Sequence, residues 1–212
     1  MECDAKIPEP PESAGTPLST SAGTPLSTPA GSALLKAAAA RPVTLVGLMG
    51  AGKTTVGRRL AARLHLPFVD ADAEIELASG LSVAEIFERF GEAHFRDGER
   101  RVIARLIDGV PKVIATGGGA FIQADTRALI LERTLAVWLD ADIATLVERV
   151  RRRNTRPLLK DRDPGAVLSE LAAVRNPIYA EAHVRIASKD MPHGDTVEAI
   201  IAALVAVNGG VA

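Results

Sequence analysis

A glycine-rich stretch that ends in a lysine and two threonines is the part of the sequence best suited to chemistry. Residues 47–55 read GLMGAGKTT, which fits the pattern G-x-x-x-x-G-K-[ST]. In this pattern the glycines let successive backbone N–H groups turn towards an anion at the positive end of a helix. Lys53 can reach the β- and γ-phosphates of a nucleotide, and the hydroxyl of Thr54 is placed to bind Mg²⁺. This phosphate loop therefore predicts phosphoryl chemistry.

The residues on either side of the phosphate loop predict the elements that must position it. Residues 43–46 (VTLV) are apolar and β-branched, which is typical of a buried strand. After the loop, Val56, Leu60 and Leu64 recur at helical spacing among arginines. Strand, glycine turn and helix follow in the required order, which argues against a chance glycine turn.

Two further groups of residues follow predicted strands. Asp70 and Asp72 come after residues 67–69 at alternate positions, so both carboxylates could approach Mg²⁺ and a substrate hydroxyl. The alternative is that Asp72 caps the following helix. The glycines at 117–119 follow the apolar residues 112–116, and three glycines at a strand end favour close approach by a ligand over an unstructured loop.

Five arginines lie close together between positions 149 and 156, namely Arg149, Arg151, Arg152, Arg153 and Arg156. Such a cluster is compatible with nucleic-acid binding or with an ordinary solvated face. It stands in a nearly neutral protein without interleaved aromatic residues, so an anion-clamping loop fits better. Arginine pairs with phosphate oxygens through two donors and stabilises charge that develops during transfer.

Other charged side chains carry weaker signals. Arg96 and Arg175 say little by themselves, and Glu99, Arg100 and Arg101 are predicted to form an ordinary exposed helix face. The histidines show no metal-ligand spacing, so structural roles are expected for them (His65, His94, His183 and His193).

Strand and helix patterns alternate from residue 43 onwards, which predicts a parallel sheet covered on both faces. Strands are expected at 43–46, 67–69, 112–116, 135–139 and 184–186. Helices are expected after the phosphate loop and at about 73–79, 82–108 with a break near Gly91, 124–132, 142 onwards, up to 179, and 197–207. A capping box of Ser82 and Glu85 should begin the long helix. Ligands of such sheets gather at the carboxyl ends of the strands.

The composition limits the possible partners and compartments. The chain has 212 residues, of which 47% are hydrophobic and 24% charged, with a formal net charge of −1. This balance gives no global reason to expect nucleic acid or an anionic membrane as a partner. One cysteine excludes an intramolecular disulfide framework, and no apolar run approaches the length that spans a bilayer.

Residues 1–32 differ in composition from the rest of the chain. The octapeptide SAGTPLST occurs at 13–20 and again at 21–28, in a segment rich in Pro, Gly, Ser and Thr. Such a segment cannot bury enough apolar surface to offset its ordering entropy, so disorder is predicted. It lacks the basic start and apolar centre of a secretory signal, and its acidic residues do not fit a transit peptide. It is interpreted as a cytoplasmic appendage.

The complete set of motifs resembles the shikimate kinase family, which belongs to the P-loop, nucleoside-monophosphate-kinase-like group. The resemblance covers about 43–207 and depends on six motifs: GLMGAGKTTVGRRLA (47–61), FVDADAEIE (68–76), FR (95–96), TGGGA (116–120), TRPLL (155–159) and RNPIY (175–179). It implies a three-layer α/β fold with a five-stranded parallel sheet of order 2-3-1-4-5. A kinase domain at 41–208 would follow the tail, with a lid at about 151–165.

The resemblance also implies roles for individual residues. The loop residues Gly50, Ala51, Gly52, Lys53, Thr54 and Thr55 would wrap the ATP phosphates. Arg156 in the lid would meet these phosphates, and Arg151, Met191 and Pro192 would lie near the adenine. Thr54 and Asp70 would serve Mg²⁺. Shikimate would be bound by Asp72, Arg96, Gly117, Gly118, Gly119 and Arg175. Lys53, Asp72 and Arg156 would be the catalytic residues.

The implied activity is transfer of phosphate from ATP, with Mg²⁺, to the 3-hydroxyl of shikimate in the biosynthesis of chorismate and the aromatic amino acids. The protein would be a cytoplasmic monomer that binds neither nucleic acid nor membranes. One alternative is a related small-molecule kinase, such as a gluconate or nucleotide kinase. A different class of alternative is a nucleotide-binding regulatory module whose arginines contact RNA, with strong salt dependence.

Overall fold

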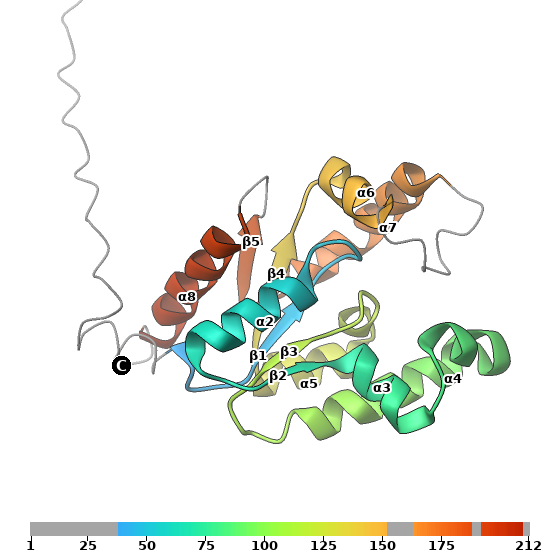
Figure 1. Ribbon diagram of the computed structural model, residues 1–212, viewed down its shortest axis with the longest axis horizontal. Helices are drawn as coiled ribbons and strands as arrows, with labels where there is room; N and C mark the ends of the chain where they lie inside the picture. Colours follow the sequence, from blue (N-terminus) through green and yellow to red (C-terminus); the bar gives the residue numbers. More distant parts are fainter. Residues whose placement is uncertain (1–37, 152–162, 188–191, 210–212) are drawn as a thin grey trace, which may run out of the picture.

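The computed structural model describes residues 38–151, 163–187 and 192–209 (Figure 1). The predicted tail at 1–32, most of the predicted lid, Arg156 and Met191 lie outside the described residues. The expectations for them stay predictions.

A five-stranded parallel sheet forms the centre of the molecule. Its strands are β1 (Val43–Val46), β2 (Phe68–Asp70), β3 (Val113–Ala115), β4 (Leu135–Asp140) and β5 (Val184–Ala187). The strand order is β2-β3-β1-β4-β5, which confirms the predicted order. β1 is the central strand and all four of its residues are buried, as its apolar, β-branched sequence requires. The five strands agree with the predicted strands to within two residues at each end.

Helices cover both faces of the sheet. They are α2 (Lys53–Leu64), α3 (Ala71–Ser79), α4 (Val83–Leu106), α5 (Ala124–Arg133), α6 (Ile143–Arg151), α7 (Pro164–Tyr179) and α8 (His193–Gly209). In Figure 1, α2 and α8 pack side by side over one face, while α5 lies behind the sheet and contacts α4. α3 packs on α4, and α6 packs on α7, at the end of the sheet where the strands finish. α8 begins four residues earlier than the sequence predicts, and a short 3-10 helix, η1 (Ala120–Ile122), was not predicted.

Local sequence signals explain the shape of α4. The Ser82 side chain accepts from the Glu85 backbone N–H, and the Glu85 carboxylate accepts from the Ser82 backbone N–H, which confirms the capping box. Gly91 has φ 79 and ψ 173, which interrupts the helical geometry at the predicted break. The second half of α4 therefore starts afresh at Gly91, and it carries the side chains that reach the site.

The phosphate loop is held against the sheet by close packing of α2. A Cβ atom at Gly57 would lie 2.6 Å from the Phe68 ring, so only glycine lets α2 approach β2 this closely. Val56, Leu60 and Leu64 are buried on the same side of α2, as their helical spacing predicts.

None of the helices in the described part of the chain is long and apolar enough to cross a membrane.

Candidate active site

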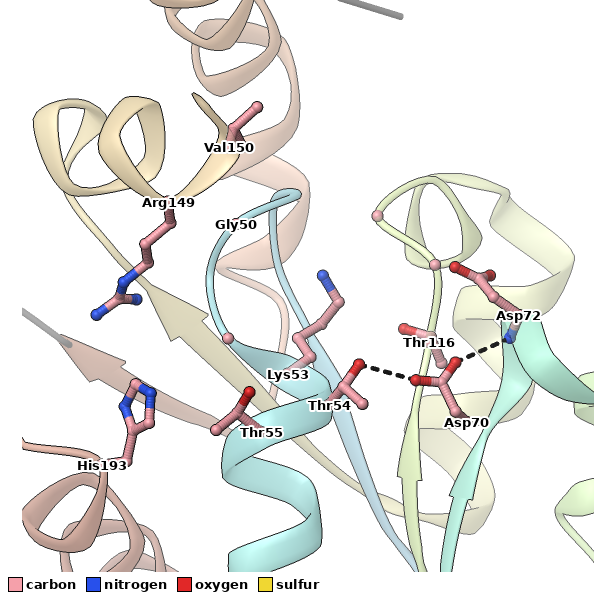
Figure 2. A pocket seen from close by; sticks show the side chains of 13 residues that line it. Gly50, Lys53, Thr54, Thr55, Asp70, Asp72, Thr116, Arg149, Val150 and His193 are labelled. Atoms are coloured by element: carbon pink, nitrogen blue, oxygen red, sulfur yellow. Dashed lines mark hydrogen bonds between the residues drawn. The ribbon is translucent and has the colours of Figure 1, made fainter. Parts of the chain in front are cut away.

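A cavity of about 400 Å³ opens at the carboxyl ends of the strands, around the phosphate loop (Figure 2). We call it the phosphate-loop cavity. Its lining comes from five separate regions of the chain: Gly50, Gly52, Lys53, Thr54, Thr55, Asp70, Asp72, Thr116, Gly117, Gly118, Arg149, Val150 and His193. The residues that the sequence singles out as phosphate-binding and metal-binding therefore meet in one place.

The glycines of the phosphate loop are required by its backbone. Gly50 has φ 84 and Gly52 has φ 90, both in the left-handed region that side chains disfavour. Gly47 has φ 134, and a Cβ atom there would lie 2.7 Å from the carbonyl oxygen of Leu139 in β4. A Cβ atom at Gly50 would lie 3.0 Å from a methyl group of Val150 in α6. The loop is thus fixed between β4 and α6, with Gly52 immediately before α2.

Lys53 is the first residue of α2, and its side chain extends back across the phosphate loop. Its ammonium group donates to the carbonyl oxygens of Gly47 at 2.8 Å and Leu48 at 3.0 Å. Figure 2 shows the side chain extended along the loop with its nitrogen at the far end. The positive charge is thereby held beside the N-terminus of α2, where the helix dipole also favours an anion.

Asp70 links the phosphate loop to the start of α3. The Thr54 hydroxyl donates to one carboxylate oxygen of Asp70 at 2.8 Å, and the other accepts from the Asp72 backbone N–H at 3.2 Å (Figure 2). Asp70 is therefore the residue that caps α3, and the alternative that Asp72 is the cap is wrong. Asp72 lies in the first turn of α3 and not on an extended chain. Helix geometry, rather than strand alternation, points its carboxylate into the cavity.

The residues around Thr54 fit a hard divalent cation. A hydroxyl oxygen and a carboxylate oxygen are ligands that Mg²⁺ prefers, and Mg²⁺ usually takes its remaining ligands from water and substrate phosphates. The described residues contain no group of three or more His, Cys, Asp or Glu side chains that could hold a metal by themselves. A magnesium ion here would accordingly depend on the phosphates of a nucleotide.

A second cavity of about 140 Å³ adjoins the first. We call it the arginine cavity, and it is lined by Met49, Asp72, Val83, Phe87, Phe95, Arg96, Glu99, Gly117, Gly118, Gly119 and Arg175. Asp72, Gly117 and Gly118 line both cavities. Arg96 and Arg175, which are 79 positions apart in the sequence, therefore lie at one site with Asp72.

Arg96 is held in place by α4. Its guanidinium donates to the Glu99 carboxylate at 2.6 Å and to Glu92 at 3.1 Å, and it lies over the rings of Phe87 and Phe95. The ion pair with Glu99 is mostly withdrawn from solvent. Two carboxylates and two aromatic rings together fix the direction of this cation before any ligand arrives.

Glu99 corrects the prediction of an exposed helix face, because only 1% of its surface is exposed. Arg100 and Arg101 are exposed as predicted. The signal for Glu99 was its spacing, since it continues a row of core positions with Phe95, Val102 and Ile103 along α4. Burial raises the pKa of Glu99, against the opposing charge and hydrogen bond of Arg96.

The three glycines at 117–119 leave room for charged side chains. A Cβ atom at Gly117 would lie 2.8 Å from carboxylate oxygens of both Asp72 and Glu99. A Cβ atom at Gly119 would overlap the Arg96 guanidinium. The sequence predicts close approach by a ligand, whereas in this structure the side chains of the protein make the close approach. Glycine at 117 and 119 is therefore needed to assemble the arginine cavity.

Arg175 lines the arginine cavity from α7, and Tyr179 on the same helix lies buried behind the glycines without lining the cavity itself. The Arg175 guanidinium donates to the carbonyl oxygen of Gly118 at 3.2 Å, and the Tyr179 hydroxyl donates to the same oxygen. No role is expected for Tyr179 from the sequence beyond its place in the RNPIY motif. Its spacing of four residues from Arg175, on one helix face, was the available signal.

The other end of the phosphate-loop cavity carries Arg149 and His193. Burial lowers the pKa of His193, and the charges of Arg149 and Arg59 add to this effect. Arg151 and Pro192, which were the expected adenine neighbours, are exposed and do not line this cavity. Arg149 lies on the side of α6 that borders the cavity (Figure 2). Arg151 follows two residues later and therefore lies on nearly the opposite side of the helix.

The fold and the phosphate loop together define a P-loop kinase. The sequence model of the shikimate kinase family matches residues 49–205, and the chain belongs to this family. It is 56% identical over 171 residues to shikimate kinase of Bradyrhizobium diazoefficiens, covering 81% of this chain and 83% of that protein. It is 58% identical over 165 residues to shikimate kinase of Caulobacter vibrioides, covering 78% of this chain and 82% of that protein.

Solved structures agree with this assignment. Shikimate kinase from Acinetobacter baumannii, determined in complex with shikimate, superimposes with a TM-score of 0.77 at 38% identity over 82% of this chain and 98% of that chain. A gluconokinase from Sinorhizobium meliloti superimposes with a TM-score of 0.56 at 19% identity, covering 81% of this chain and 95% of that one. The latter similarity shows that the fold is shared.

Proposed function

We propose that this protein transfers the γ-phosphoryl group of ATP to the 3-hydroxyl of shikimate, giving shikimate 3-phosphate and ADP. The observation that carries the proposal is the shared wall of Asp72, Gly117 and Gly118 between the phosphate-loop cavity and the arginine cavity. A donor in the first cavity and an acceptor in the second would meet at this wall. Membership of the shikimate kinase family supports the same acceptor.

The arginine cavity suits a small acid with several hydroxyl groups. Arg96 and Arg175 supply guanidinium groups that can pair with a carboxylate through two donors each. Asp72 supplies a carboxylate that can accept hydrogen bonds from acceptor hydroxyls. Phe87 and Phe95 supply apolar surface for a carbon ring. Cations at one end and an anion at the other fix which hydroxyl of the acceptor faces the nucleotide.

The phosphate-loop cavity suits the triphosphate of ATP. Backbone N–H groups of the phosphate loop and the Lys53 ammonium would bind the β- and γ-phosphates there. Arg149 and His193 lie towards the nucleoside end, and we assign them to the adenosine moiety in place of Arg151 and Pro192. Arg156 would meet the phosphates from the lid, as the family motif implies; it lies outside the described residues.

Mg²⁺ would be held by the Thr54 hydroxyl and, through water, by Asp70. When bound, it would neutralise charge on the β- and γ-phosphates. Asp72 would orient the acceptor hydroxyl and take its proton as the bond to phosphorus forms. Phosphoryl transfer depends mainly on position and charge stabilisation, so Lys53 and the loop would do most of the catalytic work. We further propose that the protein is a monomer that acts in the cytoplasm. Its nearly neutral composition gives no global reason to expect a nucleic-acid or membrane partner.

Release of ADP from MgATP, measured with a panel of acceptors, tests the proposal. We expect turnover with shikimate and none above background with gluconate or nucleoside monophosphates. Turnover with one of those acceptors and not with shikimate would overturn it.

A further inference from the structure

Tyr179 is a buried polar residue that the proposed reaction does not yet use. It is the last residue of α7, none of its surface is exposed, and its hydroxyl donates to the carbonyl oxygen of Gly118. A buried phenol usually has a hydrogen-bond partner, but this partner belongs to the lining of both cavities. The hydroxyl therefore contacts a residue of the cavity walls, although Tyr179 itself lines neither cavity.

Aromatic packing fixes the direction of the Tyr179 side chain. The Phe121 ring stacks with it at a centroid distance of 6.3 Å, and the Trp138 ring lies at 6.0 Å. Phe121 belongs to η1, directly after the glycines, and Trp138 belongs to β4. Since both contacts involve the ring and not the hydroxyl, phenylalanine at position 179 would keep them.

Arg175 and Tyr179 converge on one carbonyl group from one face of α7. They are four residues apart, and the Arg175 guanidinium donates to Gly118 at 3.2 Å beside the phenol. Burial raises the pKa of Tyr179 to about 12, although the charge and hydrogen bond of Arg175 oppose the rise. The phenol consequently keeps its proton near neutral pH and remains a donor.

Gly118 needs such a clamp because its neighbours are also glycines. A chain of three glycines has more backbone freedom than any other tripeptide, and the binding geometry must be chosen from many conformations. The peptide group is planar, so holding the Gly118 carbonyl also fixes the direction of the Gly119 N–H. Gly119 lines the arginine cavity next to Arg96.

We propose that Tyr179 is a positioning residue for the acceptor carboxylate: its hydroxyl holds the Gly118 carbonyl, and thereby Arg175 and the Gly118–Gly119 peptide, in the binding geometry. The inference rests on the proposed function, because it concerns the acceptor end of that reaction. Because Tyr179 lines neither cavity, it would touch neither ATP nor the reacting atoms. Its loss should therefore weaken acceptor binding and leave the nucleotide end unchanged.

Tyr179→Phe tests the proposal. We expect the KM for shikimate to rise roughly 3- to 15-fold, the range that loss of one buried hydrogen bond produces. The KM for ATP and the kcat should stay within about twofold, because the phosphate loop is untouched. The matched control is Thr134→Val, which removes another buried hydroxyl that donates to a backbone carbonyl, Ile130 at 2.8 Å, at the end of α5. This control should lower the Tm without changing the KM for shikimate.

Two further variants separate positioning from a general loss of stability. Replacing Tyr179 with 4-aminophenylalanine keeps a donor in the same place, and it should bring the KM back towards the wild-type value. Combined with Arg175→Lys, Tyr179→Phe should raise the KM by less than it does alone, because the residue that it positions has already changed. This double-mutant cycle compares KM values between variants, so it remains informative if either single variant is less stable.

The outcomes of this experiment separate the inference from the proposed function. A KM for shikimate within twofold of wild type in Tyr179→Phe overturns the inference, as does an equal rise in the KM for ATP. Failure of the amino-substituted variant to lower the raised KM overturns it as well. If the wild-type protein released no ADP with shikimate, the proposed function would fail first, independently of any variant.

Discussion

At the scale of single residues, the site depends on charges that are held before ligands bind. Lys53 donates to two loop carbonyls, Thr54 to Asp70, and Arg96 to Glu99 and Glu92. Because these charged groups are preorganised, they can stabilise a transition state without first having to reorient. Substitutions that alter charge or orientation at these positions should therefore affect kinetics more than stability.

Lys53→Met should lower kcat by about 100- to 1,000-fold, the usual effect of removing one preorganised charge from a transferring group. Methionine keeps most of the length of the side chain but cannot neutralise phosphate oxygens. Steady-state turnover and a thermal melt would check this result. Lys112→Met is the matched control, because Lys112 pairs with Asp108 just before β3, at the amino ends of the strands and away from the phosphate loop. Normal turnover in a folded Lys53→Met variant would contradict the role of Lys53.

Gly119→Ala should raise the KM for shikimate by about 10- to 150-fold, which corresponds to losing one charge-assisted contact. The added methyl group would overlap the Arg96 guanidinium and displace it from Glu99. Gly98→Ala provides the control on α4, because a Cβ atom there has no neighbour within 4 Å. Gly98→Ala should leave the KM unchanged and raise the Tm slightly. Equal KM values for the two variants would show that Arg96 adapts.

At the scale of elements, the position of the site depends on how the strands pair and how the helices are capped. β4 and β5 pair in parallel from Val137 and Val184 onwards. Just before this pairing, the His183 imidazole accepts from the Ala136 backbone N–H at 3.0 Å through Nδ1. The side chain thereby satisfies a backbone donor at the beginning of the ladder, but only while that nitrogen is unprotonated.

Lowering the pH should therefore weaken the hydrogen bond between the Ala136 N–H and His183 and lower the free energy of unfolding. Burial lowers the pKa of His183 below its ordinary value of 6.5, and the charge of Arg41 adds to the effect. The folded state then binds fewer protons than the unfolded state, so the stabilising contribution is present above pH 6.5 and is lost as pH falls through the lowered pKa. The free energy of unfolding measured by urea titration between about pH 7.5 and about pH 5 should show this loss.

His183→Gln should make that acid loss smaller, because the amide oxygen accepts a hydrogen bond at every pH. His94→Gln, on α4 and away from β4, serves as the comparison. The two variants having the same acid dependence would rule out the His183 contact as its source.

At the scale of the whole molecule, most of the fold could be predicted from the sequence because most strands and helices have local sequence patterns. Apolar runs predict the strands, Ser82 and Glu85 predict the start of α4, and Gly91 predicts its break, all of which the structure has. Asp70, Asp72 and the phosphate loop could be grouped because strand ends meet at one edge of a sheet. The order 2-3-1-4-5 was implied by the resemblance of six short motifs to the shikimate kinase family, and the structure confirms it.

The parts of the site that sequence did not predict depend on distant pairs of residues. Tyr179 and Gly118 are 61 positions apart, and no local pattern says which carbonyl will meet which phenol. Glu99 was missed because its neighbours Arg100 and Arg101 are exposed, although adjacent residues of a helix can lie on its buried and solvated faces. Arg149 was not separated from Arg151 because a cluster of arginines does not reveal where α6 ends.

Removing residues 1–32 should change neither turnover nor stability appreciably. Their composition predicts that they contribute no buried apolar surface, and the described domain begins after them. Calorimetry of the shortened chain checks this expectation against the full chain. A decrease in Tm beyond about 2–4 °C, which corresponds to about 1 kcal/mol at this size, would show that the segment docks on the domain.

The wall shared by the two cavities has a consequence for the design of inhibitors. A single compound that joins a polyphosphate chain to a carboxylated ring could fill both cavities at once, with its linker passing Asp72 and Gly118. Linking two weak binders makes the second binding event intramolecular, and the gain in affinity can reach about 100- to 10,000-fold when the linker fits. Other P-loop enzymes would match the polyphosphate half alone, so selectivity would come from Arg96 and Arg175.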